Sequence, residues 1–193
     1  MSSEINICNL ALSSLGQGPI TSITSPSNNT EQLCSLHYPI CRDSVLEAAN
    51  WTFANARATL DSPLVTAPNW GFTNQFELPT DCMRVIWAGR TTNEKAYDNF
   101  DWRVEGNQLL SNEAVIYIRY IKYVTDPSKF SPLFVSALAA RMAMEMCIQV
   151  TENGKLYERL VNVYSVKLSE AAANDGAQGR SQLIQQKVLS QAR

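Results

Sequence analysis

The segment 131–150, SPLFVSALAARMAMEMCIQV, contains the most apolar window of the chain and decides its architecture. Ser131 is a favoured N-cap residue, and a proline follows it at the first helical position. Apolar side chains recur every four residues, the spacing of one helix face, at Phe134, Leu138, Met142, Met146 and Val150. Because Arg141 and Glu145 interrupt the apolar run, we expect a core helix rather than a membrane span.

The residues after this helix predict a second one that packs against it. Asn153-Gly154 breaks the first helix, and the next helix runs on until it fades before Gly176. Its predicted apolar side consists of Tyr157, Val161, Tyr164 and Leu168. Each helix has about 20 residues and therefore a length of about 30 Å. We expect an antiparallel helical hairpin, long enough to form half of a bundle.

A further helix is predicted at the N-terminus. Ser2 or Ser3 caps it and Gly16 ends it. Apolar residues with helical spacing follow the cap, at Ile5, Cys8, Leu12 and Leu15. The next stretch, 16–28, is rich in Gly, Pro, Ser and Thr and is typical of a connecting loop.

Another helix is predicted from Asn28 to Asn50. Asn28 and Glu31 have the spacing of a capping box. The predicted apolar side consists of Leu33, Leu36, Ile40, Cys41, Val45 and Ala48. Pro39 lies in the interior, where it removes a backbone donor and clashes with the preceding turn, so we expect a bend near 35–38.

The middle of the chain, 51–130, predicts a small β-rich unit. It contains short runs of β-branched and aromatic residues, with candidate strands at 83–88, 102–105, 108–110 and 115–121. Gly106-Asn107 is a suitable hairpin turn. Trp51, Phe53, Trp87 and Tyr117 are expected in the core of this unit. The stretch 61–71 holds two prolines and a tryptophan, which is typical of an interaction loop.

These patterns predict an α+β protein with three parts. An antiparallel bundle of about four helices comes from 1–50 and 131–174, and the β-rich unit at 51–130 is inserted between the helix pairs. An extended C-terminal tail occupies 175–193. The length of 193 residues and the 45% hydrophobic content suit one good core with a smaller satellite unit.

Charge and cysteine content exclude several functions. The net charge is −2, so no overall basic field exists to hold nucleic acid non-specifically. The five cysteines are scattered through apolar surroundings and are expected to be reduced and buried. The N-terminus lacks the basic and apolar regions of a signal peptide, so we expect a protein that stays in the cytoplasm of its producer.

One cluster could carry chemistry. Cys34, His37 and Cys41 are spaced three and four residues apart and could lie along one helix face as a partial zinc site, or as a thiol with its base. A fourth ligand and an orienting group are not evident, and Pro39 distorts the intervening turn. We therefore expect core thiols, no metal, no cofactor and no enzyme activity. A small thiol-dependent enzyme or a zinc site stays the alternative.

Four stretches carry a resemblance to a known family: 36–46 (LHYPICRDSVL), 51–58 (WTFANARA), 76–85 (FELPTDCMRV) and 130–140 (FSPLFVSALAA). The opening stretch 10–20, with Leu-Gly and Pro-Ile, adds to them. Together they resemble the tail tubular protein A family, the head-to-tail adaptors of tailed bacteriophages. The resemblance covers most of the chain.

The resemblance implies a structural protein of the virion neck, present in the host cytoplasm during assembly. It implies a ring, commonly a dodecamer, between the portal protein and the distal nozzle or tube protein. Double-stranded DNA would pass through the ring without sequence-specific binding. It implies neither catalysis nor contact with a membrane.

Two segments are the expected docking surfaces. The tail is the only basic segment, and its few apolar residues suit a segment that becomes ordered on a partner, although an ordinary frayed terminus is the alternative. For portal docking we select Arg180, Leu183, Ile184, Lys187, Val188 and Leu189. For the distal tail protein we select Leu64, Val65 and Trp70 of the interaction loop and Phe72 directly after it.

Overall fold

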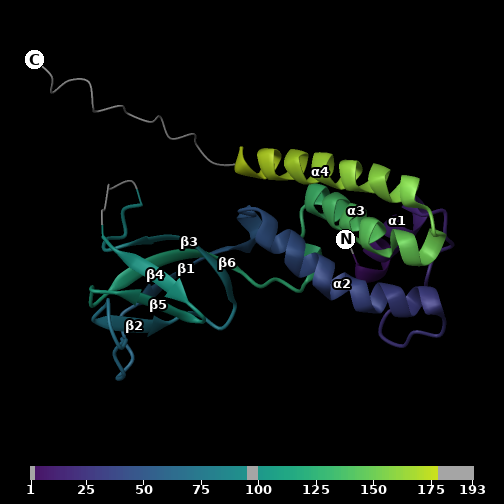
Figure 1. Ribbon diagram of the computed structural model, residues 1–193. Helices are drawn as coiled ribbons and strands as arrows, with labels where there is room; N and C mark the ends of the chain where they lie inside the picture. Colours follow the sequence, from purple (N-terminus) through teal and green to yellow (C-terminus); the bar gives the residue numbers. More distant parts are fainter. Residues whose placement is uncertain (1–2, 95–99, 178–193) are drawn as a thin grey trace, which may run out of the picture.

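The computed structural model describes residues 3–94 and 100–177. Figure 1 shows a group of helices at one end of the molecule and a group of strands at the other. The strands lie between the second and third helices in sequence, so the predicted α+β class with an inserted β unit is confirmed.

Helix α1, Glu4–Ser14, begins and ends where local signals predict. The Ser3 hydroxyl accepts a hydrogen bond from the Asn6 N–H at 3.2 Å, and Gly16 has a φ of 69° after the last turn. Its buried residues are Ile7, Cys8, Ala11 and Leu12. They face α3, the central helix of the bundle.

Helix α2, Asn29–Ala48, contains Pro39 without a break, and Figure 1 shows it changing direction along its length, as the proline predicts. Asn28 caps it by accepting from the Glu31 N–H at 2.9 Å. The other half of the predicted capping box is wrong, because the Glu31 carboxylate accepts from Ser27 instead, from its N–H at 2.7 Å and its hydroxyl at 2.9 Å.

Helices α3, Pro132–Thr151, and α4, Gly154–Gly176, form the predicted hairpin. Ser131 and Asn153 cap them, each accepting from a backbone N–H three residues on. α3 is long and apolar enough to cross a membrane by length and composition alone, but 61% of that window is buried inside the protein. That burial is typical of the central helix of a bundle.

The predicted apolar sides of two helices are partly wrong. Leu36 and Ile40 of α2 are each 59% exposed, while Cys34, Tyr38 and Leu46 are buried instead. On α4, Tyr157 and Val161 are exposed, and the buried residues are Leu160, Ala171 and Asp175. The buried face of each helix is rotated from the predicted one because the contact with α3 decides it.

The β unit consists of two three-stranded antiparallel sheets. The first has the order β1-β6-β3, with β1 Asn55–Leu60, β6 Ile116–Lys122 and β3 Cys82–Gly89. The second has the order β2-β5-β4, with β2 Asn74–Glu77, β5 Gln108–Ser111 and β4 Trp102–Glu105. The hairpin at Gly106, which has a φ of 60°, is confirmed. β1 and β2 were not predicted.

Each part has a core of its own, and Ile121 of β6 joins the core of the bundle. The β unit encloses Leu60, Phe76, Leu78, Ala88, Leu109, Ile116, Ile118 and Tyr120 between its sheets. Trp51 and Phe53, expected there, lie in the bundle core instead, where both pack on Phe134 with ring centroids 5.0 and 5.1 Å apart. Trp87 and Tyr117 are half-buried and line a hollow at the surface of the first sheet, so all four core assignments are wrong.

Asp175 and Arg42 are two of the side chains that connect the bundle to the β unit and the segment leading into it, beside Ile121 of β6 in the bundle core. Asp175, near the end of α4, is 4% exposed and accepts from the Thr52 N–H at 2.6 Å and from its hydroxyl at 3.0 Å. This caps the short 3-10 helix η1, Thr52–Ala54, that leads into β1. Arg42 of α2 is buried, donates to the Tyr123 hydroxyl just after β6, and stacks 4.9 Å from the centre of that ring.

Candidate interaction surface of the β unit

The segment between β1 and β2 is a long loop held by hydrogen bonds to its neighbours. The Leu64 N–H donates to the Gln75 carbonyl at 2.8 Å, and the Gln75 side chain donates to the Thr66 carbonyl at 2.6 Å. At the far end of the loop, the Thr73 N–H donates to the Asn112 side chain at 3.0 Å. Gly71, with a φ of 88°, provides a turn that other residues rarely adopt.

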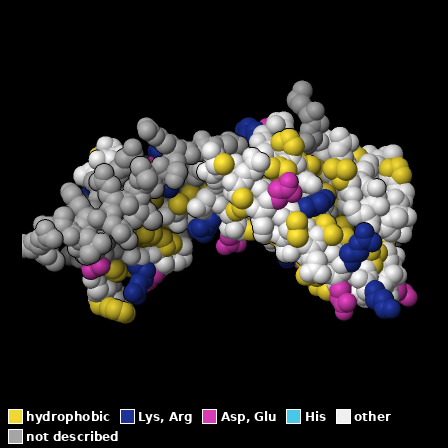
Figure 2. All heavy atoms as spheres, turned by 90° about the horizontal axis from the view of Figure 1, so that it is seen from above, with side chains coloured by type: hydrophobic (Ala, Val, Ile, Leu, Met, Phe, Trp, Pro, Cys, Tyr) yellow, Lys and Arg dark blue, Asp and Glu magenta, His cyan; other side chains and the backbone are white. Residues whose placement is uncertain are grey.

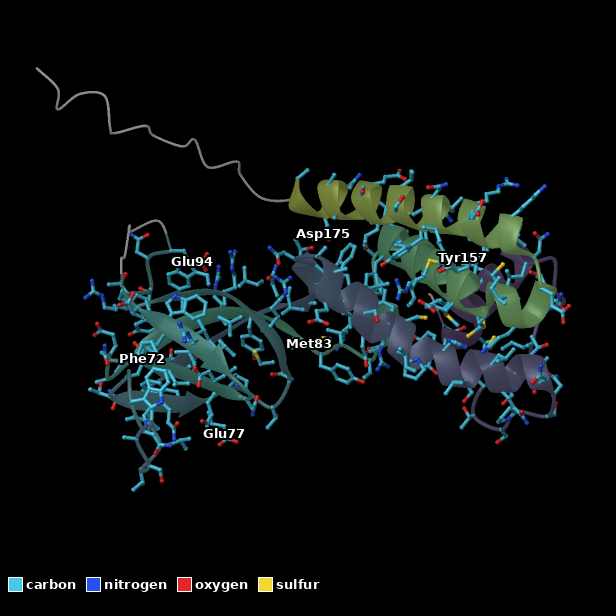
Figure 3. The ribbon with its side chains drawn as sticks, viewed as in Figure 1. Phe72, Glu77, Met83, Glu94, Tyr157 and Asp175 are labelled. Atoms are coloured by element: carbon cyan, nitrogen blue, oxygen red, sulfur yellow. The ribbon has the colours of Figure 1, made fainter. Side chains whose placement is uncertain are left out.

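The loop exposes two large apolar side chains. Val65 is fully exposed, and Trp70 is 82% exposed. Leu64 and Phe72 are half-buried, so two of the four predicted contact residues anchor the loop and two project from it. A fully hydrated tryptophan gains much on burial, and tryptophan is enriched among residues that dominate protein interfaces. Figure 3 shows Phe72 on the part of the β unit far from α3 and α4.

A hollow of about 330 Å³ lies between this loop and the outer face of the second sheet. Strand register places Gln75, Leu110 and Arg103 in one row across that sheet. The loop residues from Thr66 to Phe72 form the opposite wall. The hollow therefore combines an apolar floor at Leu110 with polar groups at its rim, the composition typical of a pocket for a partner's side chain.

Sequence reasoning missed the sheet side of this surface. Arg103, Glu105 and Gln108 border the hollow, and Arg103 pairs loosely with Glu105 at 4.0 Å. The signal available in the sequence was the alternation Trp-Arg-Val-Glu at 102–105, which places Arg103 and Glu105 on one face of the predicted strand. Without β2, which pairs with β5, nothing placed this strand beside the loop.

The predicted portal-docking residues, Arg180, Leu183, Ile184, Lys187, Val188 and Leu189, lie outside the described residues. The last described residue, Ala177, follows the end of α4. Because Asp175 binds Thr52, this end of α4 lies beside the start of the β unit, as Figure 1 also shows. α4 continues to Gly176, two residues into the segment 175–193 that the sequence predicted as the tail.

The thiol cluster is part of the bundle core. Cys34 is fully buried with its Sγ 4.0 Å from Met146 Sδ, and Cys41 is 1% exposed. Burial raises the pKa of the Cys41 thiol to about 12. His37 is half-buried, and within the described residues its Nε2 has no hydrogen-bond partner. Within residues 3–94 and 100–177, no three His, Cys, Asp or Glu side chains are grouped to hold a metal.

Figure 2 shows the molecule from above, with hydrophobic side chains scattered among polar ones over the helical part. The bundle exposes Leu10 of α1, Leu36 and Ile40 one turn apart on α2, Ile148 of α3 and Val166 of α4. In the loop of the β unit, exposed Val65 and Trp70 lie beside a hollow, and among the described residues of the bundle exposed Leu10 also borders one. Compared with known proteins, the chain matches neither a protein-family model nor a curated protein sequence.

Proposed function

We propose that this protein is a structural head-to-tail adaptor of a tailed bacteriophage, a ring component between the portal and the distal tail through which double-stranded DNA passes. The observation that carries the proposal is the loop of the β unit, where Val65 and Trp70 project into solvent beside a hollow. Such a surface is typical of a protein-binding site. The sequence resemblance to the tail tubular protein A family supplies the identity of the partners.

The division of the chain into two parts supports two separate partners. The bundle and the residues after α4 would bind the portal, and the β unit would bind the distal tail protein. Asp175 and Arg42 hold the two parts together, so that force on one part reaches the other. A component that joins two assemblies needs such a connection, because a loose linker would leave the joint weak.

The burial of the thiols supports a structural role over the enzymatic alternative. A thiol nucleophile needs an accessible, polarised sulfur, whereas Cys34 and Cys41 are both buried and the pKa of Cys41 is raised to about 12. The base of such a thiol site would have to be His37, because it is the only histidine of the sequence.

The proposal is tested by ordered binding. The purified protein is mixed with the portal ring, and then with the distal tail protein, and each complex is isolated by sedimentation. We expect Val65→Ser combined with Trp70→Ser to leave portal binding intact and to abolish recruitment of the distal protein. Val166→Ser is the matched control, because Val166 is a 66% exposed apolar residue of α4. Unchanged distal recruitment by the double variant would contradict the assignment of this loop.

A further inference from the structure

Two arginines lie directly opposite each other on neighbouring strands of the first sheet. Arg57 of β1 pairs in register with Arg119 of β6. Like charges in directly opposed positions repel and weaken strand pairing. A negative group placed between them offsets this repulsion, and the position between two guanidinium groups can receive a carboxylate.

One carboxylate bridges the two guanidinium groups. Glu94, from the connection between β3 and β4, places Oε1 3.1 Å from Arg57 Nη2 and Oε2 3.4 Å from Arg119 Nη1. Among the described residues it is the only carboxylate that pairs with either arginine. The three groups together keep one net positive charge. Figure 3 shows Glu94 on the β unit, where it lies over the first sheet, while the hollow beside Trp70 lies on the second sheet.

This internal bridge is weak enough to be exchanged. The side chain of Arg57 is 76% exposed and that of Arg119 is 34% exposed, and ion pairs at such exposure contribute only about 0–1 kcal/mol. Arg57 also donates from Nε to Glu94 Oε1 at 3.2 Å, and the exposure of the Arg57 side chain leaves this bond open to exchange with another carboxylate.

A hollow of about 280 Å³ adjoins the arginine pair. Its lining includes Arg57, Glu94, Thr59, Trp87 and Tyr117. Gly89 makes room for the indole of Trp87, because a Cβ at position 89 would overlap the ring. The hollow therefore depends on a glycine and an aromatic side chain in a fixed arrangement, with an anion-binding pair at its edge.

We propose that Arg57 and Arg119, together with the hollow beside Trp87, form a docking site for an acidic segment of a partner protein, one carboxylate of which replaces Glu94. The partner's carboxylate takes the place between the two guanidinium groups, and the neighbouring part of its segment fills the hollow. Arginine pairs recognise carboxylates through forked donors, and the aromatic wall adds buried apolar area. This site is distinct from both docking surfaces of the proposed function and does not depend on them.

The charge balance favours an acidic protein segment over a nucleic acid. Nucleic-acid binding without sequence preference requires several phosphate contacts along a basic surface. Here the local excess is a single positive charge, and the whole chain carries −2. The two oxygens of one carboxylate already engage the pair in this structure, which shows that the geometry suits that group.

The test measures binding of a fluorescein-labelled hexaglutamate peptide by fluorescence anisotropy. Glu94→Gln removes the internal competitor, and we expect the peptide to bind about fivefold more tightly, the factor that corresponds to about 1 kcal/mol. In the Glu94→Gln background, Arg57→Gln combined with Arg119→Gln should weaken binding by at least about tenfold. Circular dichroism shows that each variant is folded.

Arg103→Gln is the matched control, because Arg103 is an exposed arginine of the second sheet with a loose carboxylate partner, and it should leave peptide binding unchanged. Glu94→Gln binding no more tightly than the natural protein would overturn the proposal. If the double arginine variant bound the peptide as tightly as Glu94→Gln alone does, the proposal would be overturned too. If a single-stranded oligonucleotide bound these arginines more tightly than hexaglutamate does, the result would show that the partner is a nucleic acid and not an acidic protein segment.

Discussion

Replacement of Asp175 by alanine should loosen the joint between the helical bundle and the β unit. The Asp175 carboxylate is 4% exposed and accepts two hydrogen bonds from Thr52, at 2.6 and 3.0 Å. A hydrogen bond to a charged group contributes about 1.5–3 kcal/mol to stability. Thr52 is itself exposed, so water replaces part of each bond and the lower end of that range applies. The two bonds together then amount to about 3 kcal/mol.

Two smaller effects oppose this loss. A negative charge near a helix C-terminus is unfavourable by about 0.3–1 kcal/mol, and Asp175 lies in the last turn of α4. Alanine also has a higher helix propensity than aspartate, by about half a kcal/mol. Subtracting both leaves a net destabilisation of about 2 kcal/mol, which corresponds to a fall in Tm of about 4–8 °C for a chain of this size.

Urea denaturation of Asp175→Ala measures the free energy of unfolding directly, and hydrogen exchange locates the change. We expect faster amide exchange at 52–54, the short helix that Asp175 caps. Asn174→Ala is the control, because Asn174 is the exposed neighbour on the same turn. A free energy of unfolding within about 0.5 kcal/mol of the natural protein's, the range of ordinary surface substitutions, would refute the reasoning. Unchanged exchange at 52–54 would refute it as well.

Four further results are expected. Val65→Ser with Trp70→Ser should leave Tm within about 2 °C of the natural protein's, because both side chains are exposed, while particles carrying it lack distal tails; a complete tail on such particles would contradict the assignment. Removal of 178–193 should leave urea unfolding of the bundle unchanged and weaken portal attachment, and equal attachment would assign the portal contact elsewhere. The Cys41 thiol, with its pKa raised to about 12 by burial, should resist an aromatic disulfide reagent at pH 8 until the protein is unfolded; rapid reaction in the folded state would contradict its burial. Hydrogen bonds from Ser27 lower the pKa of Glu31 in the folded protein. The stability that ionised Glu31 adds to the folded state is therefore fully present above the ordinary pKa of 4.5 and is lost as the pH falls through the lowered pKa. Glu31→Gln should flatten the loss of stability at acid pH, and an unaltered loss would argue against these hydrogen bonds.

Local signals were sufficient to predict the helices. Ser131 and Asn28 cap their helices through contacts three residues away, so the chain within one turn determines where each helix begins. The hairpin at Gly106 is local in the same sense. The buried sides of α2 and α4 were predicted less well, because Leu36 and Ile40 are as apolar as the residues that α3 covers.

The parts that were missed depend on contacts distant in sequence. β1 is a short strand, NARATL, with polar residues on its outer side, and its pairing with β6 spans more than half of the β unit. Without β1, nothing could place Arg57 opposite Arg119. The contact of Asp175 with Thr52 joins residues 123 positions apart, so no local pattern could show that this carboxylate is buried. The loop between β1 and β2 was predictable as a loop because Pro63, Pro68 and Gly71 lie in it.

The adaptor role is tested most directly by electron microscopy of the purified protein mixed with the portal ring of the same phage. We expect a second ring stacked on the portal, with the β units at the end away from it and a copy number that the image gives directly. Bare portal rings beside small free particles would contradict the adaptor role.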